Sequence, residues 1–237
     1  RQVLGWREFM YQIHEYTDGL RRIPNKDGTW TEHPTVSIDS TIPEQDGGSL
    51  INVLNYKTPL PDAFWGKKCG LNCLDSVVKD VMDDGFTHHI PRLMVLANIA
   101  TLLEIKPREI TDWFWVSFID AFDWVVEPNV LAMGTFATGE VLSTKPYISG
   151  AGYINKMSNF CKGCTFHPKK NCPLTRLYWA YLDNHQERFK DNFRMKMVLR
   201  SLDKRSDDKK ATDRAVFTWM VETLAKGEGL TVDGLPT

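Results

Sequence analysis

The sequence contains no apolar run that approaches the roughly 20 residues needed to span a bilayer as a helix, so we expect no membrane span. Internal repeats and low-complexity segments are also absent, which argues against a repeat array. Net charge is nearly absent at −1, so the chain as a whole has no electrostatic attraction to nucleic acid or to an anionic membrane. A DNA partner would therefore need a local basic patch.

The amino-acid composition is that of a globular protein, with 42% hydrophobic and 25% charged residues in 237. This length suits one large domain or two small ones. The 8 Trp and 12 Phe favour either a helical core or a pocket for a flavin or nucleobase. The chain starts at Arg1, already within a helical pattern, and we expect it to be part of a longer polypeptide.

Apolar residues recur at helical spacing through most of the chain. The first predicted helix covers residues 3–16, where Val3, Trp6, Met10 and Ile13 share one face. The other predicted helices cover residues 72–103 with Gly85 and Pro91 loosening or kinking it, 112–126 with Thr111 as N-cap, 173–189, 194–204 and 209–226.

Two stretches are rich in proline and glycine and predict irregular structure. Residues 21–62 read as a long loop, with one short extended piece near residues 51–54. Residues 127–153 read as a second loop layer. A loop as long as the first is uncommon in a compact domain, so we expect it to be functional or peripheral.

Four of the five cysteines form the most specific pattern in the chain. Cys161 and Cys164 form a C-x2-C pair, Cys172 follows after seven further residues, and Cys73 is the best candidate for a fourth ligand. Four sulfur ligands suit zinc or an iron–sulfur cluster, and a disulfide pair is the alternative without a metal. Cys69 then remains as a structural thiol. This use of cysteine favours an intracellular, reducing compartment, the cytoplasm or an organelle matrix.

Several sequence runs carry a resemblance to a known family. They are HHIPRLM at residues 88–94, DAFDWVVEPN at 120–129, KPY at 145–147, YINKMS at 153–158 and GWREF at 5–9. Over about residues 1–205 the chain resembles the iron–sulfur bacterial cryptochromes and photolyases, whose repair-active members are the prokaryotic (6-4) photolyases. Cys73, Cys161, Cys164 and Cys172 fall where that family has its cluster ligands.

The resemblance implies an all-α fold, the photolyase/cryptochrome-type helical domain that holds FAD and a [4Fe-4S] cluster. Residues 1–237 would form this one domain. The family's N-terminal α/β antenna domain has no counterpart in this chain, and neither has the upstream segment that contributes to the flavin phosphate site. The implied partners are UV-damaged DNA and the antenna domain or other protein subunits.

The resemblance gives one of two adjacent histidines, His88 or His89, the role of proton donor to a damaged base, because a histidine titrates near neutral pH. Neighbouring helical positions point about 100° apart, so we expect only one ring to face the pocket. Two polar core residues are the alternative. Trp6 and Tyr147 would line the pocket for the flipped lesion, and Arg92 would pair with a phosphate or a carboxylate.

Trp65, Trp113 and Phe114 occupy positions at which the family passes electrons to photoexcited flavin. Trp113 would lie nearest the flavin and Trp65 further out. Phe114 replaces a tyrosine and cannot supply a phenol for a proton-coupled relay. Core packing is the alternative for all three rings.

Arg7, Asp120, Glu127 and Asn129 are the flavin contacts that the resemblance implies. A buried flavin needs hydrogen-bond partners at its ribose and ring nitrogens, which carboxylates and amides near a helix end can supply. Arg7 suits the cofactor phosphates. Exposed surface is the alternative for the acidic residues.

The resemblance thus implies light-driven electron transfer from reduced FAD to a pyrimidine dimer, with the (6-4) product as the expected lesion. Lys169 and Lys170, beside the cysteine loop, would meet the DNA backbone, although such pairs are usually solvated surface. The alternatives are a blue-light sensor with the same cofactors, and a scaffold subunit of a larger assembly that keeps the cluster without the flavin. A further alternative, the iron–sulfur domain of a primase large subunit, is disfavoured by the GWREF and HHIPR runs.

Overall fold

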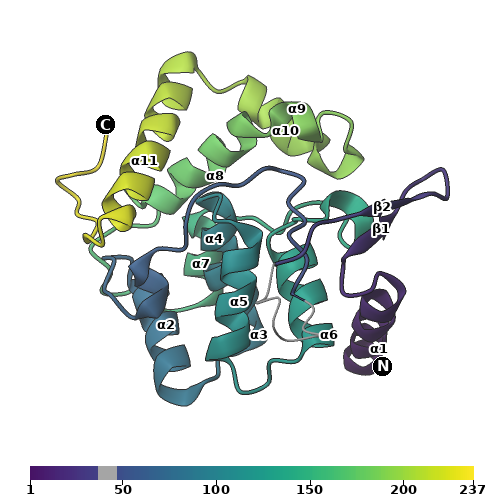
Figure 1. Cartoon of the computed structure of the whole chain (residues 1–237). Helices are drawn as coiled ribbons and strands as arrows, with labels where there is room; N and C mark the ends of the chain where they lie inside the picture. Colours follow the sequence, from purple (N-terminus) through teal and green to yellow (C-terminus); the bar gives the residue numbers. More distant parts are fainter. Residues whose placement is uncertain (37–46) are drawn as a thin grey trace. The chain divides into compact units, whose positions relative to one another are not determined.

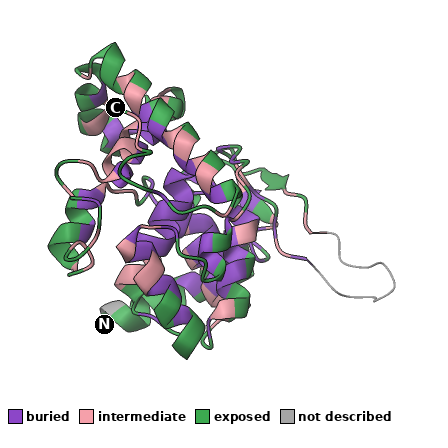
Figure 2. Ribbon diagram, turned by 90° about the vertical axis from the view of Figure 1, so that its left-hand side faces the viewer, coloured by how far each residue is buried: buried purple, intermediate pink, exposed green. Residues whose placement is uncertain are grey.

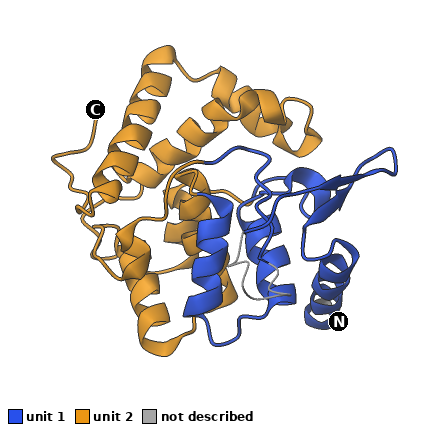
Figure 3. Ribbon diagram, viewed as in Figure 1, with its two compact units in different colours: residues 1–56, 106–146 blue, residues 57–105, 147–237 orange. Residues whose placement is uncertain are grey.

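A computed structural model describes residues 1–36 and 47–237, and most of the described chain is helical (Figure 1). Internal contacts divide it into two compact units, each assembled from two stretches of sequence (Figure 3). Unit 1 comprises residues 1–56 and 106–146, and unit 2 comprises residues 57–105 and 147–237. No helix of the described part is both long and apolar enough to cross a membrane. The helical character agrees with the predicted fold class, whereas one domain over residues 1–237 stays a prediction.

Unit 1 contains a long helix, a hairpin and a group of short helices. Its elements are α1 (Gln2–Tyr16), β1 (Arg22–Pro24), β2 (Trp30–Glu32), α5 (Pro107–Ser117), α6 (Asp123–Val126), the π-helix η3 (Glu127–Gly134) and the 3₁₀ helix η4 (Gly139–Val141). The hairpin is antiparallel, with Ile23 opposite Thr31. Helix α1 packs against α6 and η3, and the core of the unit includes Leu20, Ile51 and Leu131.

Unit 2 holds most of the helices. Its elements are η1 (Asp62–Trp65), α2 (Asn72–Asp84), α3 (His89–Pro91), the π-helix η2 (Arg92–Ala97), α4 (Asn98–Leu102), α7 (Ala151–Met157), α8 (Pro173–Asn184), α9 (Gln186–Phe189), η5 (Phe193–Met195), α10 (Lys196–Asp203) and α11 (Asp207–Ala225). Helices α8 and α11 pack along each other. The buried Asp213 of α11 links them, because it accepts hydrogen bonds from Arg176 of α8 and from Arg205.

Burial follows the helical period that the sequence displays, with buried residues gathered on particular faces of the helices (Figure 2). In α11 the buried positions Val216, Met220 and Leu224 recur every four residues. The helices predicted over residues 3–16, 173–189, 194–204 and 209–226 are confirmed, the second as α8 with α9 and the third as η5 with α10. The spacing of apolar residues is sufficient to predict these helices, because each of them buries one apolar stripe along its length.

The single helix predicted over residues 72–103 is wrong, because the chain breaks after α2. Gly85 has a φ of +62°, the left-handed conformation that ends a helix. A second helical run then extends from His89 to Leu102 as α3, η2 and α4. Pro91 lies in the first turn of this run, where no helical partner exists for a backbone N–H, so it starts the helix instead of kinking it.

The predictions for residues 112–126 and 127–153 are also corrected. Helix α5 begins at Pro107, so Thr111 lies inside it, buried, with its hydroxyl donating to the Pro107 carbonyl (2.7 Å). The expected loop after residue 127 begins instead as the π-helix η3, which continues α6 without a break and contains Pro128.

The long loop predicted over residues 21–62 contains more regular structure than expected. The hairpin of β1 and β2 occupies its start, and η1 begins at its end. The predicted extended piece at residues 51–54 is wrong, since this stretch forms no strand and includes a turn. The part of this prediction that falls on residues 37–46 lies outside the described residues.

Candidate functional site

The four candidate ligand cysteines all belong to unit 2. Cys73 lies in the first turn of α2 and is buried, with 7% of its surface exposed. Cys161 and Cys164 lie in the turns that follow α7, and Cys172 immediately precedes Pro173, the first residue of α8. Two helix starts and one loop therefore present the thiols.

Specific hydrogen bonds fix these segments. The side chain of Asn72 donates to the Phe160 carbonyl (2.7 Å), which ties the start of α2 to the cysteine loop. Asp75 accepts from the backbone N–H groups of Cys69 (2.8 Å) and Gly70 (3.2 Å). Gly163 has a φ of +82°, which permits the turn between the two cysteines of the C-x2-C pair.

The thiols influence one another electrostatically. Burial raises the pKa of Cys73, and the other three candidate cysteines raise it further. Burial likewise raises the pKa of Cys172 to about 12, with Cys164 and Cys161 contributing. Within the described residues, however, no group of three or more His, Cys, Asp or Glu side chains is arranged to hold a single metal ion. Burial raises the pKa of the fifth thiol, Cys69, and the nearby Asp75 and Cys73 raise it further.

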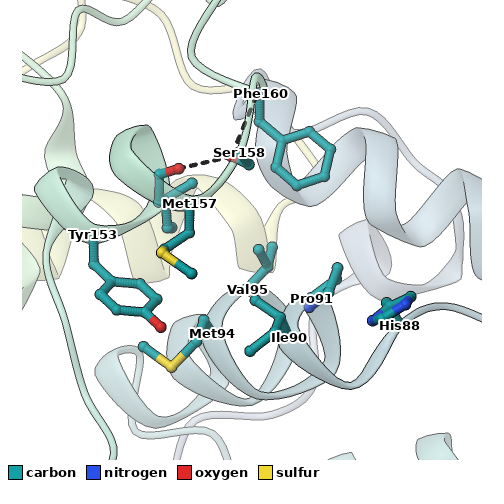
Figure 4. A pocket seen from close by; sticks show the side chains of 10 residues that line it. His88, Ile90, Pro91, Met94, Val95, Tyr153, Met157, Ser158 and Phe160 are labelled. Atoms are coloured by element: carbon teal, nitrogen blue, oxygen red, sulfur yellow. Dashed lines mark hydrogen bonds between the residues drawn. The ribbon is translucent and has the colours of Figure 1, made fainter.

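A pocket of about 300 Å³ lies within unit 2, close in sequence to the cysteine loop (Figure 4). Its walls are the helical run from α3 into η2 and the helix α7 with the residues after it. Its lining consists of His88, Ile90, Pro91, Met94, Val95, Tyr153, Ile154, Met157, Ser158 and Phe160. The side chains of Tyr153 and Met157 point across the pocket toward the helix that carries Met94. The pocket is thus mostly apolar, with a histidine, a phenol and a hydroxyl as its polar groups.

The structure distinguishes the two predicted proton donors. Both rings are exposed and lie 5.3 Å apart, but only His88 lines the pocket. Arg92 donates from Nε to the Thr87 carbonyl (2.8 Å) and stacks on Phe86, so its guanidinium has protein partners. Tyr147 is 40% exposed and does not line this pocket. The residues that sequence reasoning did not single out are the apolar lining and Tyr153, although the YINKMS run contains the latter.

The predicted flavin contacts all lie in unit 1. Asn129 donates to the Val125 carbonyl (2.7 Å) and accepts from the indole N–H of Trp6 (3.1 Å). A predicted flavin contact and a predicted lesion contact are therefore bonded to each other. The guanidinium of Arg7 lies 5.1 Å above the ring of Trp124, and Asp120 is exposed in the turn between α5 and α6.

Glu127 forms a buried ion pair that the sequence did not reveal. Its Oε1 accepts from Nη1 of Arg108 at 2.8 Å, and both side chains are less than a tenth exposed. Arg108 also pairs with Asp112 (2.7 Å), one helical turn further along α5. The pKa of Glu127 is raised, because burial outweighs the attraction of Arg108. Its second oxygen, Oε2, is buried without a hydrogen-bond partner in the described structure.

The aromatic electron-transfer candidates differ in environment. Trp113 is 1% exposed in unit 1 and forms edge contacts with Phe114 (5.3 Å) and Phe118 (5.9 Å). Phe114 is stacked on Phe118 at 5.0 Å. Trp65 belongs to unit 2 and is 55% exposed at the end of η1. Trp113 and Phe114 are therefore packed in the core of unit 1, whereas Trp65 is not a core residue.

The lysine pair beside the cysteine loop, Lys169 and Lys170, is exposed, and its contact with DNA stays a prediction. The backbone N–H of Lys169 donates to Nδ1 of His167 (3.2 Å), and that of Lys170 donates to the His167 carbonyl (3.1 Å). His167 thus holds the return segment that leads back to Cys172, whose N–H donates to the same carbonyl.

Comparison with known proteins gives two relatives, and no family model matches the chain. The chain is 33% identical over 213 residues to a protein named (6-4) photolyase from Agrobacterium fabrum, a match that covers 88% of this chain and 37% of that protein. It is 34% identical over 97 residues to an uncharacterized protein of Acanthamoeba polyphaga mimivirus, covering 41% of this chain and 76% of the viral protein.

These observations define a helical protein with a group of thiols and an apolar pocket. The similarity to a photolyase across most of the chain supports a relationship to the photolyase and cryptochrome family. The chain spans little more than a third of the length of that relative.

Proposed function

We propose that the chain is the helical cofactor-binding part of a photolyase-like protein that repairs UV-damaged DNA. In this proposal Cys73, Cys161, Cys164 and Cys172 hold a [4Fe-4S] cluster, FAD is the photochemical cofactor and the (6-4) photoproduct is the lesion. The similarity to a (6-4) photolyase over 88% of the chain carries the proposal. The helical fold and the mutual influence of the four thiols support it.

The choice of a cluster over a single zinc ion rests on the family resemblance of the cysteine pattern. Zinc binds four thiolates at about 2.3 Å each, whereas an iron–sulfur cluster distributes its thiolates over several irons. The thiols raise one another's pKa, which suits either metal centre.

Unit 1 offers polar atoms that a flavin can use. Glu127 Oε2 and the hydroxyls of Thr138 and Ser143 are buried without hydrogen-bond partners in the described structure, and such atoms usually bond to a ligand or to water. Bound FAD would supply the light-driven electron transfer. Trp113 is an oxidisable side chain in the same unit, whereas Phe114 has no phenol.

The proposed role of the histidine pair is proton donation to the lesion. His88 lines the pocket of unit 2 and His89 adjoins it in sequence. A histidine acts as a general acid only within hydrogen-bond reach of the accepting atom, directly or through one water. The apolar lining around His88 suits the ring of a base that has left the stack.

A scaffold without flavin is the second candidate. It is favoured by the protein partners of the predicted contacts, since Asn129 bonds Trp6 and Glu127 pairs with Arg108. In this case the cluster would stabilise the fold, because metal binding free energy is also folding free energy.

An absorption spectrum of protein purified without oxygen, followed by a repair assay, tests the proposal. If the chain is a repair enzyme, we expect a flavin absorption band at ~450 nm and a broad shoulder from the cluster at ~410 nm, since these absorptions belong to the cofactors. It also predicts that blue light reverses a (6-4) photoproduct in an oligonucleotide while a dark control does not. The shoulder alone would favour the scaffold. Absence of both bands after reconstitution with iron, sulfide and FAD would reject both candidates.

A further inference from the structure

The segment from α9 to α10 carries a local excess of positive charge. Residues 186–205 contain seven Lys or Arg and three Asp or Glu, in a chain whose net charge is −1. This is the kind of local basic patch that a nearly neutral chain needs in order to bind a polyanion.

Three of these cations form a row along α10. Lys196, Arg200 and Lys204 are four residues apart, so about 6 Å of helix axis separates each from the next. All three are exposed, while Leu202 is fully buried and fixes the opposite face of the helix to the protein. Nearby ion pairs join Lys190 to Glu187 and Arg205 to Asp213, and none in the described part of the chain involves the three cations of the row.

The row borders a groove of about 300 Å³ between α9 and α10. Gln186 and Glu187 line it from α9, Lys196, Leu199, Arg200 and Asp203 line it from α10, and Lys190 lies between the helices. Glu187 pairs with Lys190 at 2.9 Å, so the remaining charges of the wall are the two cations Lys196 and Arg200 and the one acid Asp203. Ammonium and guanidinium groups at a concave surface suit phosphate oxygens, which accept strong charge-assisted hydrogen bonds.

The partner of a basic helix is either a nucleic acid or an anionic membrane. Phe193 and Met197 are 78% and 82% exposed, which by itself would suit a membrane surface. However, an interfacial helix needs a free apolar face, and the apolar face of α10 is occupied by protein contacts at Leu202. The ammonium of Lys196 also lies 5.5 Å from the centre of the Phe193 ring, so a cation covers that aromatic face. These contacts favour a nucleic acid, with its regular row of phosphates, over a membrane as the partner of α10.

We propose that the groove and cation row of α9 and α10, the α10 basic groove, bind the phosphate backbone of duplex DNA without regard to sequence or damage. Duplex DNA presents one charge per about 1.7 Å of its axis, and neutralising it releases bound counterions. The groove shares no lining residue with the pocket that contains His88. The contact needs neither flavin nor cluster chemistry, so it does not rest on the proposed repair activity.

The test measures binding of the full chain to an undamaged, fluorescently labelled duplex in the dark, between roughly 50 and 200 mM salt. The variant K196Q/R200Q/K204Q removes the row. The matched control K26Q/K57Q/K226Q removes the same charge at exposed lysines outside the groove. Three lost phosphate contacts should reduce the slope of log K against log salt by about 2.7 and weaken binding roughly 10- to 100-fold at about 100 mM salt, with the control unchanged.

Three results would overturn the inference. One is an unmodified chain that does not bind the duplex, and another is a control variant that loses as much affinity as the row variant. The third is a row variant that keeps its DNA affinity but no longer sediments with phosphatidylserine vesicles, since the groove would then be a membrane contact. Circular dichroism confirms that each variant is folded. A chain that binds undamaged duplex through the row and repairs nothing would leave this inference standing and remove only the repair activity.

Discussion

Replacing Arg108 with methionine tests whether Glu127 serves the fold of unit 1. The change keeps an unbranched side chain similar in length to the aliphatic part of arginine, and it removes the guanidinium that pairs with Glu127 at 2.8 Å. The carboxyl remains buried, with 4% of the residue exposed, and its Oε2 has no other hydrogen-bond partner among the described residues. Breaking a buried ion pair on one side costs about 3–5 kcal/mol, so we expect a loss of unfolding free energy of that size at neutral pH.

The loss should depend on pH in a defined direction. Burial already raises the pKa of Glu127 above its ordinary value of 4.5, and removing Arg108 raises it further. An acid whose pKa is higher in the folded state loses stability as pH rises from its unfolded pKa toward its folded pKa. The loss of unfolding free energy in Arg108→Met should therefore become smaller as pH falls toward 5. One titrating group can change this free energy by at most about 1.4 kcal/mol for each pH unit, or roughly 2–3 kcal/mol between pH 7 and pH 5.

Urea unfolding of the full chain, followed by tryptophan fluorescence and circular dichroism, gives these free energies. The double variant R108M/E127L should lie within about 1–2 kcal/mol of the unmodified protein, because apolar replacement of a whole buried pair is often neutral or stabilising. The control K106M breaks an exposed pair with Glu109 on the same helix and should cost less than about 1 kcal/mol. Equal losses for R108M and K106M, or a deficit for R108M that does not change with pH, would refute the reasoning.

Four further predictions concern the candidate sites. Cys73→Ala should lose the cluster absorbance and much of the fold, while Cys69→Ala should lose neither; the reverse result in an iron assay would show that the ligand assignment is wrong. Trp113→Phe should retain FAD but slow its photoreduction under steady blue light, and equal rates would remove this residue from the electron path. Replacing the proton-donating histidine, with His88→Ala as the first variant, should abolish dimer reversal while FAD and iron contents stay unchanged; full repair would exclude that residue as the donor. Burial raises the pKa of Glu104, but hydrogen bonds from His185 and Asn184 lower it more, so the folded pKa lies below the ordinary value. Glu104→Gln should therefore reduce the free energy of unfolding by about 1–3 kcal/mol above pH 4.5, and this loss should vanish as pH falls through the folded pKa. A loss that persists in urea titrations at acid pH would contradict this.

Sequence pattern predicted the parts of this protein that depend on neighbours in the chain. The helices α1, α8, α10 and α11 follow from apolar residues at helical spacing, because each buries one stripe against the rest of its unit. The C-x2-C pair is equally local, since a short turn places both of its thiols. The sequence offered Cys73 only as the best candidate for a fourth ligand, and the structure places it where the other three cysteines influence its pKa.

Local pattern was less reliable where glycine and proline occur. Gly85 ends α2 through its left-handed backbone, whereas Pro91 lies in the first turn of a helical run that the sequence pattern expected it to kink. Pro128 lies inside the continuous helical run of α6 and η3, where the sequence pattern assigned a loop from residue 127. The same residue type either breaks or begins a helix, depending on whether a helical carbonyl waits for its missing N–H. That condition is set by where the previous element ends.

Tertiary structure alone decided the partners of the candidate site residues. Glu127 meets Arg108 from another element of unit 1, and Trp6 meets Asn129 across 123 positions of sequence. No periodicity predicts such pairs, because a buried polar group takes whichever partner the packing of distant segments brings within about 3 Å. The sequence by itself determined which chemical groups this protein has and which helices carry them. Folding determined which of those groups face each other, since burial makes an unpaired charge or donor too costly to leave alone.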